Sequence, residues 1–123
     1  GAFKDIVTKV IKFMIKRGCA VENMTAVIGP SISQKNYEVK EDFKKKFIKK
    51  DRSNLRYFKI IKKKLYFDLT KYIYSSLKTS AVKYVDVLKI DTYDAKNKFF
   101  SARRAIKLKH GDYGRNISII MLN

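Results

Sequence analysis

The sequence has few of the residues that build metal centres and disulfides. It contains one cysteine, Cys19, one histidine, His110, and no tryptophan. A lone cysteine cannot form an internal disulfide, which favours a reducing, cytoplasmic compartment. A zinc site usually needs three or four His, Cys or carboxylate ligands, and catalytic Ser-His-acid or Cys-His groups need a partnered histidine. We therefore expect no metal ligand in this chain and interpret His110 as a solvated loop residue.

Long apolar runs are also missing. No stretch approaches the roughly 18 consecutive apolar residues of a membrane span. Charged residues interrupt the first apolar segment, which argues against a signal peptide. We expect no membrane partner. The 123 residues suit one domain, and 46% apolar with 33% charged residues is typical of a globular protein.

Acidic residues are scarce: 11 Asp and Glu stand against 29 Lys and Arg, a net charge of +18. Such an excess can indicate a nucleic-acid partner. An AT-rich genome would also produce it, because Lys (23 residues) greatly outnumbers Arg (6 residues) and Ile is abundant. We interpret the runs Lys44–Lys46 and Lys62–Lys64 as solvated faces, and a nucleic-acid-binding module remains an alternative.

The first helix is predicted over residues 2–17, where apolar residues recur at helical spacing, and Gly18 ends it. The apolar residues cover an arc of about 200°, whereas a surface helix needs about 100°. We therefore expect this helix to be covered on more than one side. No capping residue precedes it, which suggests either a chain cut from something longer or a processed or tagged N-terminus.

Further strands are predicted at residues 25–28, 84–90 and 117–122, the last covered on both faces. Residues 65–67 are expected to be extended, and residues 99–101 to start another strand. Helices are predicted over 38–50 and after Asp68, with an irregular segment at 51–63. This order predicts an α+β fold, a layered mixed-sheet sandwich flanked by helices.

Arginine is rare enough for its positions to carry information. Arg103, Arg104 and Arg115 are three of the six arginines and fall within 13 positions. Arginine offers a planar bidentate donor suited to phosphate or carboxylate. The alternative is a salt-bridged structural pair. Gly29, before Pro30, either forms a turn or lets the backbone approach a ligand.

Four blocks, in this order, resemble the laccase-domain family, also called polyphenol oxidase or multicopper polyphenol oxidoreductase. Residues 26–32 (AVIGPSI) with Tyr37-Glu38-Val39 resemble its "IGP-x-I…YEV". Residues 66–69 (YFDL) resemble its hydrophobic-D-L helix start. Residues 99–104 (FFSARR) resemble its "FFSYRR", and Gly114-Arg115 with the closing strand resembles its "TGR".

The resemblance implies zinc-dependent purine nucleoside phosphorolysis, with adenosine deaminase activity in some members. It implies purine nucleoside and phosphate as ligands. The family carries "HAGW[KR]G" before the first helix, and Gly1 matches its last residue. The family's zinc ligands are the His of that motif and a Cys and a His further upstream, none of which is present here. The substrate-binding residues that the resemblance favours are Gly29, Arg103, Arg104 and Arg115.

We therefore expect residues 1–123 to be the C-terminal part of a single laccase-like domain. Alone it should hold no zinc and show no turnover, and its partner should be the missing N-terminal half or a second copy. Three departures from the family pattern affect the shape of the pocket: Asp91-Thr92 replaces a Cys-Thr pair, Ala102 a Tyr, and Tyr113 a Thr. An inactive remnant of the family is a further alternative.

Overall fold

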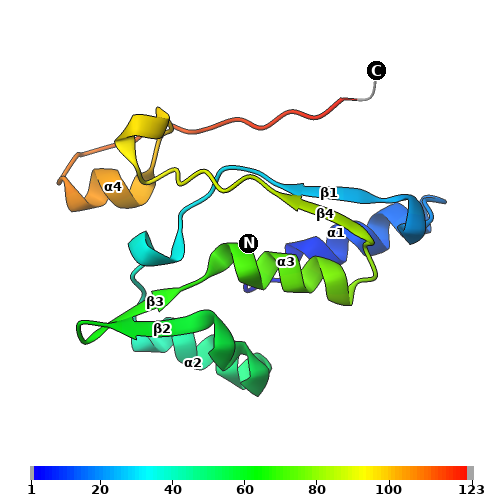
Figure 1. Ribbon diagram of the computed structural model, residues 1–123, viewed down its shortest axis with the longest axis horizontal. Coiled ribbons are helices and arrows are strands. Elements are labelled where there is room, and N and C mark those ends of the chain that lie inside the picture. The colour runs from blue at the N-terminus through cyan, green and yellow to red at the C-terminus, as the bar shows by residue number, and fades with distance from the viewer. Residues whose placement is uncertain (1, 122–123) are drawn as a thin grey trace.

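The computed structural model describes residues 2–121, which contain both helices and strands (Figure 1). Gly1 and Leu122, to which predictions above refer, lie outside this range. Short 3₁₀ turns cover Val21–Asn23, Gln34–Asn36, Arg52–Tyr57 and Ala95–Asn97. The main elements are α1 (Ile6–Lys16), β1 (Thr25–Ile28), α2 (Glu41–Lys50), β2 (Phe58–Ile61), β3 (Lys64–Phe67), α3 (Leu69–Thr79), β4 (Tyr84–Val87) and α4 (Ala102–Lys107).

The strands form two small sheets. β1 pairs in parallel with β4, Thr25 opposite Tyr84 and Ile28 opposite Val87, and β2 pairs antiparallel with β3. Helices α1 and α3 pack on one face of the β1–β4 sheet, where a cluster of apolar residues is buried (Figure 1). The predicted α+β class is confirmed. That cluster consists of Ile11, Met24, Ile28, Leu77 and Val82.

A second core is built from aromatic rings under the β2–β3 hairpin. Phe47 of α2 and Phe67 of β3 are 1% and 0% exposed, with ring centroids 4.9 Å apart. Tyr72 of α3 meets Phe47 edge-to-face at 5.1 Å. Such edge-to-face contacts add to the apolar area that the rings bury. This cluster joins α2, the hairpin and α3 into one body.

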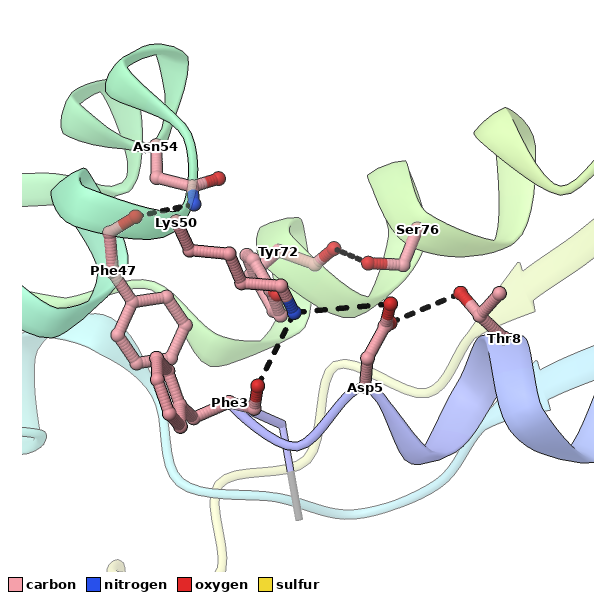
Figure 2. Close-up of polar contacts among 8 residues, drawn as sticks. All are labelled: Phe3, Asp5, Thr8, Phe47, Lys50, Asn54, Tyr72 and Ser76. Atoms are coloured by element: carbon pink, nitrogen blue, oxygen red, sulfur yellow. Dashed lines mark hydrogen bonds and ion pairs between the residues drawn. The ribbon is translucent and has the colours of Figure 1, made fainter.

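The start of α1 is fixed to the end of α2 by polar contacts (Figure 2). Lys50 Nζ donates to the carbonyl of Phe3 at 3.2 Å and lies 3.8 Å from the Asp5 carboxylate. Asn54, which is 7% exposed, donates its amide to the carbonyl of Phe47 at 2.8 Å. The same carbonyl also accepts the main-chain amide of Asp51 at 3.1 Å, so the Asn54 side chain adds a second bond that fixes the 3₁₀ turn at residues 52–57 to the last turn of α2.

Helix α1 ends as predicted and begins later than predicted. Gly18 has φ 93°, and the amide of Cys19 donates to the carbonyl of Met14, the bond of a glycine-terminated helix. Asp5 occupies the N-cap position, but its carboxylate accepts from the Thr8 hydroxyl and caps no amide. Within α1 only Ile11 is buried. The broad apolar arc remains largely exposed, including Ile6, Val10, Phe13, Met14 and Ile15.

The hairpin was not predicted, because its turn carries no typical turn residue. Lys62 and Lys63 have φ 47° and 63°, the two positive angles of a type I′ turn, which Asn and Gly normally occupy. Two lysines there resemble part of a solvated run. Pairing of β2 with β3, together with the aromatic rings beneath them, outweighs this local preference.

Two strand predictions were wrong and one was too long. β4 ends at Val87 rather than residue 90. Residues 99–101 lead into α4, whose N-cap is Ser101, with its hydroxyl accepting from the Arg104 amide at 3.2 Å. Residues 117–121 are not in a strand, and Ile117 and Ile120 are 84% and 91% exposed. A strand needs a neighbouring edge to pair with, and no strand in residues 2–121 is paired with this tail.

We predict that Phe67→Ala lowers the free energy of unfolding by about 3–5 kcal/mol, because it leaves a cavity at the centre of the aromatic cluster. Urea denaturation followed by circular dichroism measures this. Ile60→Ala on the exposed side of the hairpin is the control, expected to change stability by about 0.5 kcal/mol or less. Equal losses for the two variants would contradict the assignment of the core.

Candidate functional site

The candidate site is organised by the carboxylate of Asp91, which follows β4. Asp91 Oδ1 accepts from the amides of Ser33 at 3.2 Å and Tyr93 at 2.8 Å. Asp91 Oδ2 accepts from the Asn36 side chain at 2.7 Å and from the Ser33 hydroxyl. The main chains also meet, since Ser31 and Asp91 form a parallel bridge. The segments that leave β1 and β4 are thereby held together.

These bonds change the acidity of Asp91. Partial burial acts to raise the pKa of its carboxyl, but the hydrogen bonds from Ser33, Tyr93 and Asn36 outweigh that effect and hold the pKa below its usual value. Asp91 is therefore ionised at neutral pH. Its negative charge is already bound by four hydrogen-bond donors of the protein itself.

Arg104 fixes the next segment. Its guanidinium donates to the carbonyls of Thr92 at 3.1 Å, Tyr93 at 2.8 Å and Phe99 at 2.7 Å. Three carbonyl acceptors on one guanidinium tie the 92–99 loop to α4. Arg104 thus holds α4 in place, and Asp91 in turn holds the start of that loop.

Arg103, its neighbour on α4, points to a different place. Its guanidinium carbon lies 5.4 Å from the ring centroid of Tyr37, a cation–π contact. Arg103 lines a cavity of about 340 Å³ between α4, β3 and the 3₁₀ turn at residues 34–36. The other lining residues are Lys35, Asn36, Glu38, Lys64, Tyr66, Tyr93, Ile106 and Lys107. We call it the Arg103 cavity.

The Arg103 cavity combines positive charge with aromatic rings. Four cationic side chains line it, and its one carboxylate, Glu38, lies 3.3 Å from Lys64 Nζ. The Lys107 ammonium lies 5.9 Å from the ring centroid of Tyr93. Cations favour an anionic ligand, and the tyrosine faces can stack against a planar ring. The lining therefore suits a ligand with both a phosphate and a heterocycle.

A second cavity, of about 320 Å³, lies at the carboxyl ends of β1 and β4. In open α/β sheets ligands commonly bind at this edge. Lys35 lines both cavities. Gly29 directly follows β1, two residues before Ser31, which lines this second cavity. Apart from its two chain neighbours, no residue has an atom within 4 Å of the position of a Cβ at Gly29, and Gly29 itself lines neither the second cavity nor the Arg103 cavity.

Arg115 lies on the C-terminal tail. Its guanidinium stacks on Tyr113 at 4.3 Å and lies 3.8 Å from the Asp112 carboxylate. The tail is joined to the start of α4, because Asn116 exchanges two hydrogen bonds with the main chain of Phe100, at 2.9 and 2.7 Å. The ring of Phe100 occupies the space where a side chain at Gly114 would be, within 2.4 Å of that Cβ position.

The four residues predicted to bind substrate are therefore distributed over the site. Arg103 faces a cavity, Arg104 binds the 92–99 loop, Arg115 contacts its own neighbours on the tail, and Gly29 lies near the second cavity.

The residues present do not fit a zinc site. Among residues 2–121, no three His, Cys, Asp or Glu side chains come together to ligate a metal. Cys19 is exposed after α1, and His110 is exposed after α4. No helix in the described range is long and apolar enough to cross a bilayer.

A model of the multi-copper polyphenol oxidoreductase laccase family matches residues 1–123. The chain belongs to this laccase-domain family. One curated relative, a purine nucleoside phosphorylase of Rickettsia prowazekii (strain Madrid E), is 36% identical over 111 residues, covering 89% of this chain and 45% of the relative. Another, a purine nucleoside phosphorylase of Rickettsia conorii (strain ATCC VR-613 / Malish 7), is 34% identical over 119 residues, covering 95% and 48%. The chain spans about half the length of the curated relatives it matches.

Sequence reasoning on this laccase-domain chain missed most of the cavity lining. Lys35 and Tyr93 lie in no motif, Tyr66 lies in the YFDL block but was not predicted to bind a ligand, and Lys64 was interpreted as part of a solvated run. Asp91 was noticed only because it departs from the family's Cys-Thr pair. The available signal was an acidic residue among so many lysines, directly after the strand predicted at residues 84–90.

We predict that Asp91→Asn destabilises the protein by about 1–3 kcal/mol at pH 7, because an amide presents donors to groups that already donate. The folded pKa of Asp91 is lowered, so its contribution is complete above the unfolded pKa of about 3.9 and is lost as the pH falls through the folded value. The difference between wild type and variant should therefore narrow from pH 6 to pH 3.

Urea denaturation across that pH range measures the difference. Asp112→Asn, at a carboxylate that is 89% exposed, is the matched control and should change stability by about 0.5 kcal/mol or less. A difference for Asp91→Asn that stays constant with pH would refute the role of the charge.

Proposed function

We propose that this chain supplies the nucleoside- and phosphate-binding side of a purine nucleoside phosphorylase of the laccase-domain family. The observation that carries the proposal is the Arg103 cavity, in which four cations and two tyrosines face one volume of about 340 Å³. The names of the two curated relatives support the same reaction class.

Phosphorolysis joins a phosphate oxygen to C1′ of the ribose while the bond from C1′ to the base nitrogen breaks. The phosphate must be held close to C1′, and its charge must be neutralised while the two reactants are aligned. Arg103 is suited to bind phosphate, with Lys35, Lys64 and Lys107 adding positive charge. Tyr66 and Tyr93 would hold the base or ribose by their faces.

Arg104 and Asp91 serve as positioning residues in this proposal. Arg104 fixes α4 against the 92–99 loop, and Asp91 fixes the start of that loop. Arg115 and Gly29 are also proposed as substrate-binding residues, on the family resemblance of Gly114-Arg115 and of residues 26–32, although neither lines the Arg103 cavity.

Zinc dependence and adenosine deaminase activity, both implied by the family resemblance, belong to the assembled domain in this proposal. The zinc ligands would come from a part of the domain outside this chain.

We predict that Arg103→Gln weakens binding of inorganic phosphate in the presence of inosine by about 10- to 100-fold, the loss expected for one charge-assisted hydrogen-bonding group. NMR titration of the 123-residue chain, followed at α4 and the cavity tyrosines, measures it. Arg52→Gln removes the same charge from an exposed position in the 3₁₀ turn at 52–57 and is the matched control. Equal weakening by both variants would indicate general charge attraction and contradict the site.

A separate prediction concerns zinc. The purified 123-residue chain should hold far less than one zinc per molecule by elemental analysis, and should produce neither hypoxanthine from inosine with phosphate nor inosine from adenosine. Stoichiometric zinc or turnover in that sample would overturn the division of the site between this chain and another part of the domain.

A further inference from the structure

The positive charge of the chain is concentrated in one part of the sequence. Residues 40–64, which we call the basic lobe, hold twelve Lys and Arg against three Asp and Glu, a net charge of +9. The other 98 residues hold seventeen Lys and Arg against eight Asp and Glu, which is also +9. A codon bias of the genome acts on the whole chain. It therefore explains why lysine is common, but not why half of the net charge falls in about a fifth of the sequence.

The basic lobe is one structural unit with its cations on the outside. It consists of α2, the 3₁₀ turn at residues 52–57, strand β2 and the hairpin turn into β3. α2 and the hairpin lie below α3 in the view of Figure 1, away from the β1–β4 sheet. Phe43, Phe47 and Phe58 pack in the aromatic cluster between α2 and the hairpin. Of the twelve cationic side chains, eleven are exposed and Lys44 is half-buried.

These cations have few acidic partners. Within residues 2–121, two of the twelve form ion pairs, Lys50 with Asp5 at 3.8 Å and Lys64 with Glu38 at 3.3 Å. Like charges held on one small body repel one another, and a bound polyanion relieves that repulsion. The lobe therefore favours a ligand with many negative charges.

Four exposed lysines are the best candidates for contact with such a ligand. Lys45 and Lys49 lie one turn apart on the same side of α2, and Lys62 and Lys63 form the hairpin turn. In the described residues, none of the four has a carboxylate within 4 Å, and none lines the Arg103 cavity or the second cavity. Their charges are thus available to a partner and are separate from the candidate site.

The surface of the lobe suits phosphate groups better than unpaired bases or a bilayer. None of its aromatic residues is exposed, so the lobe has no platform on which unpaired bases could stack. The rings of α2 are on its inner side, and the two exposed large apolar residues of the lobe, Leu55 and Ile60, come from different segments. α2 therefore has no exposed apolar face to insert among lipids. Lysine ammonium groups bind phosphates as point charges, and phosphate contacts carry no base sequence.

We propose that the basic lobe binds the phosphate backbone of double-stranded nucleic acid, independently of base sequence. A duplex presents closely spaced phosphates along its outside, and neutralising them with lysines releases bound counterions. The inference goes beyond the proposed phosphorolysis and does not depend on it. Lys64 is the one residue of the lobe that also lines the Arg103 cavity.

Fluorescence anisotropy of a labelled DNA duplex of about 20 base pairs, between about 50 and 300 mM salt, measures this binding. The dissociation constant at about 150 mM salt should lie between about 1 and 100 μM, and affinity should fall steeply as salt rises. A duplex of unrelated sequence and an RNA duplex should each bind within about threefold of the first. A single strand of the same length should bind at least about threefold more weakly, because its phosphates are less densely spaced and its bases find no ring to stack on.

A lobe variant removes the four candidate charges and keeps the fold. Gln matches Lys in helix propensity, and Asn followed by Gly is favoured in the type I′ turn. At about 50 mM salt it should bind the duplex at least about tenfold more weakly, with a log–log salt slope smaller by about 2 to 4. The substitutions are Lys45→Gln, Lys49→Gln, Lys62→Asn and Lys63→Gly.

The matched control removes four exposed lysines outside the lobe and so has the same net charge as the lobe variant. It should bind the duplex within about threefold of wild type, because the charges that it loses lie elsewhere. Circular dichroism checks that both variants are folded. The control substitutions are Lys9→Gln, Lys16→Gln, Lys71→Gln and Lys96→Gln.

Four results would overturn the inference: no duplex binding at about 100 μM protein in about 50 mM salt, equal weakening by the two variants, tighter binding of the single strand, or tighter binding of vesicles that contain phosphatidylserine. Binding of inorganic phosphate in the presence of inosine should be unchanged in the lobe variant. Loss of duplex binding with phosphate binding intact therefore separates this surface from the proposed function, and either can fail without the other.

Discussion

One carboxylate determines the arrangement of the site. Asp91 draws the segment after β1 and the segment after β4 to the same point through Ser33, Asn36 and Tyr93. The 92–99 loop starts there, Arg104 binds that loop to α4, and α4 presents Arg103 to the cavity. In a chain with a net charge of +18, Asp91 supplies the negative partner for this partly buried cluster of donors.

The parts of the fold that could be predicted are those governed by local pattern. The glycine end of α1, strand β1 and the Asp68 cap of α3 follow from residue type and spacing, and all three are present. The hairpin at Lys62–Lys63 could not be predicted, because its turn residues are atypical and long-range packing decides it. The tail at residues 117–121 has the composition of a buried strand. Composition does not show whether another strand is available to pair with it, and in the described residues none does.

In the candidate site, too, some residues could be predicted from local sequence and others only from the folded chain. Arginine scarcity pointed to Arg103, Arg104 and Arg115 as anion-binding candidates, yet it could not separate Arg103 from Arg104. Both lie on α4, which was not predicted, and adjacent residues on a helix point in directions about 100° apart. Arg103 lines a cavity, whereas the Arg104 guanidinium donates to main-chain carbonyls of the 92–99 loop. The tyrosines and lysines around Arg103 come from four separate segments, and only the folded chain brings them together.

The contact between Gly114 and Phe100 limits the substitutions that this surface can accept. The aromatic ring fills the volume that any larger residue at position 114 would require. A methyl group there would require the Phe100 ring to move, next to the two hydrogen bonds that join Asn116 to the main chain of Phe100. The path of residues 114–116 beside the start of α4 therefore depends on the absence of a side chain at Gly114, and a larger residue there would need a smaller one in place of Phe100.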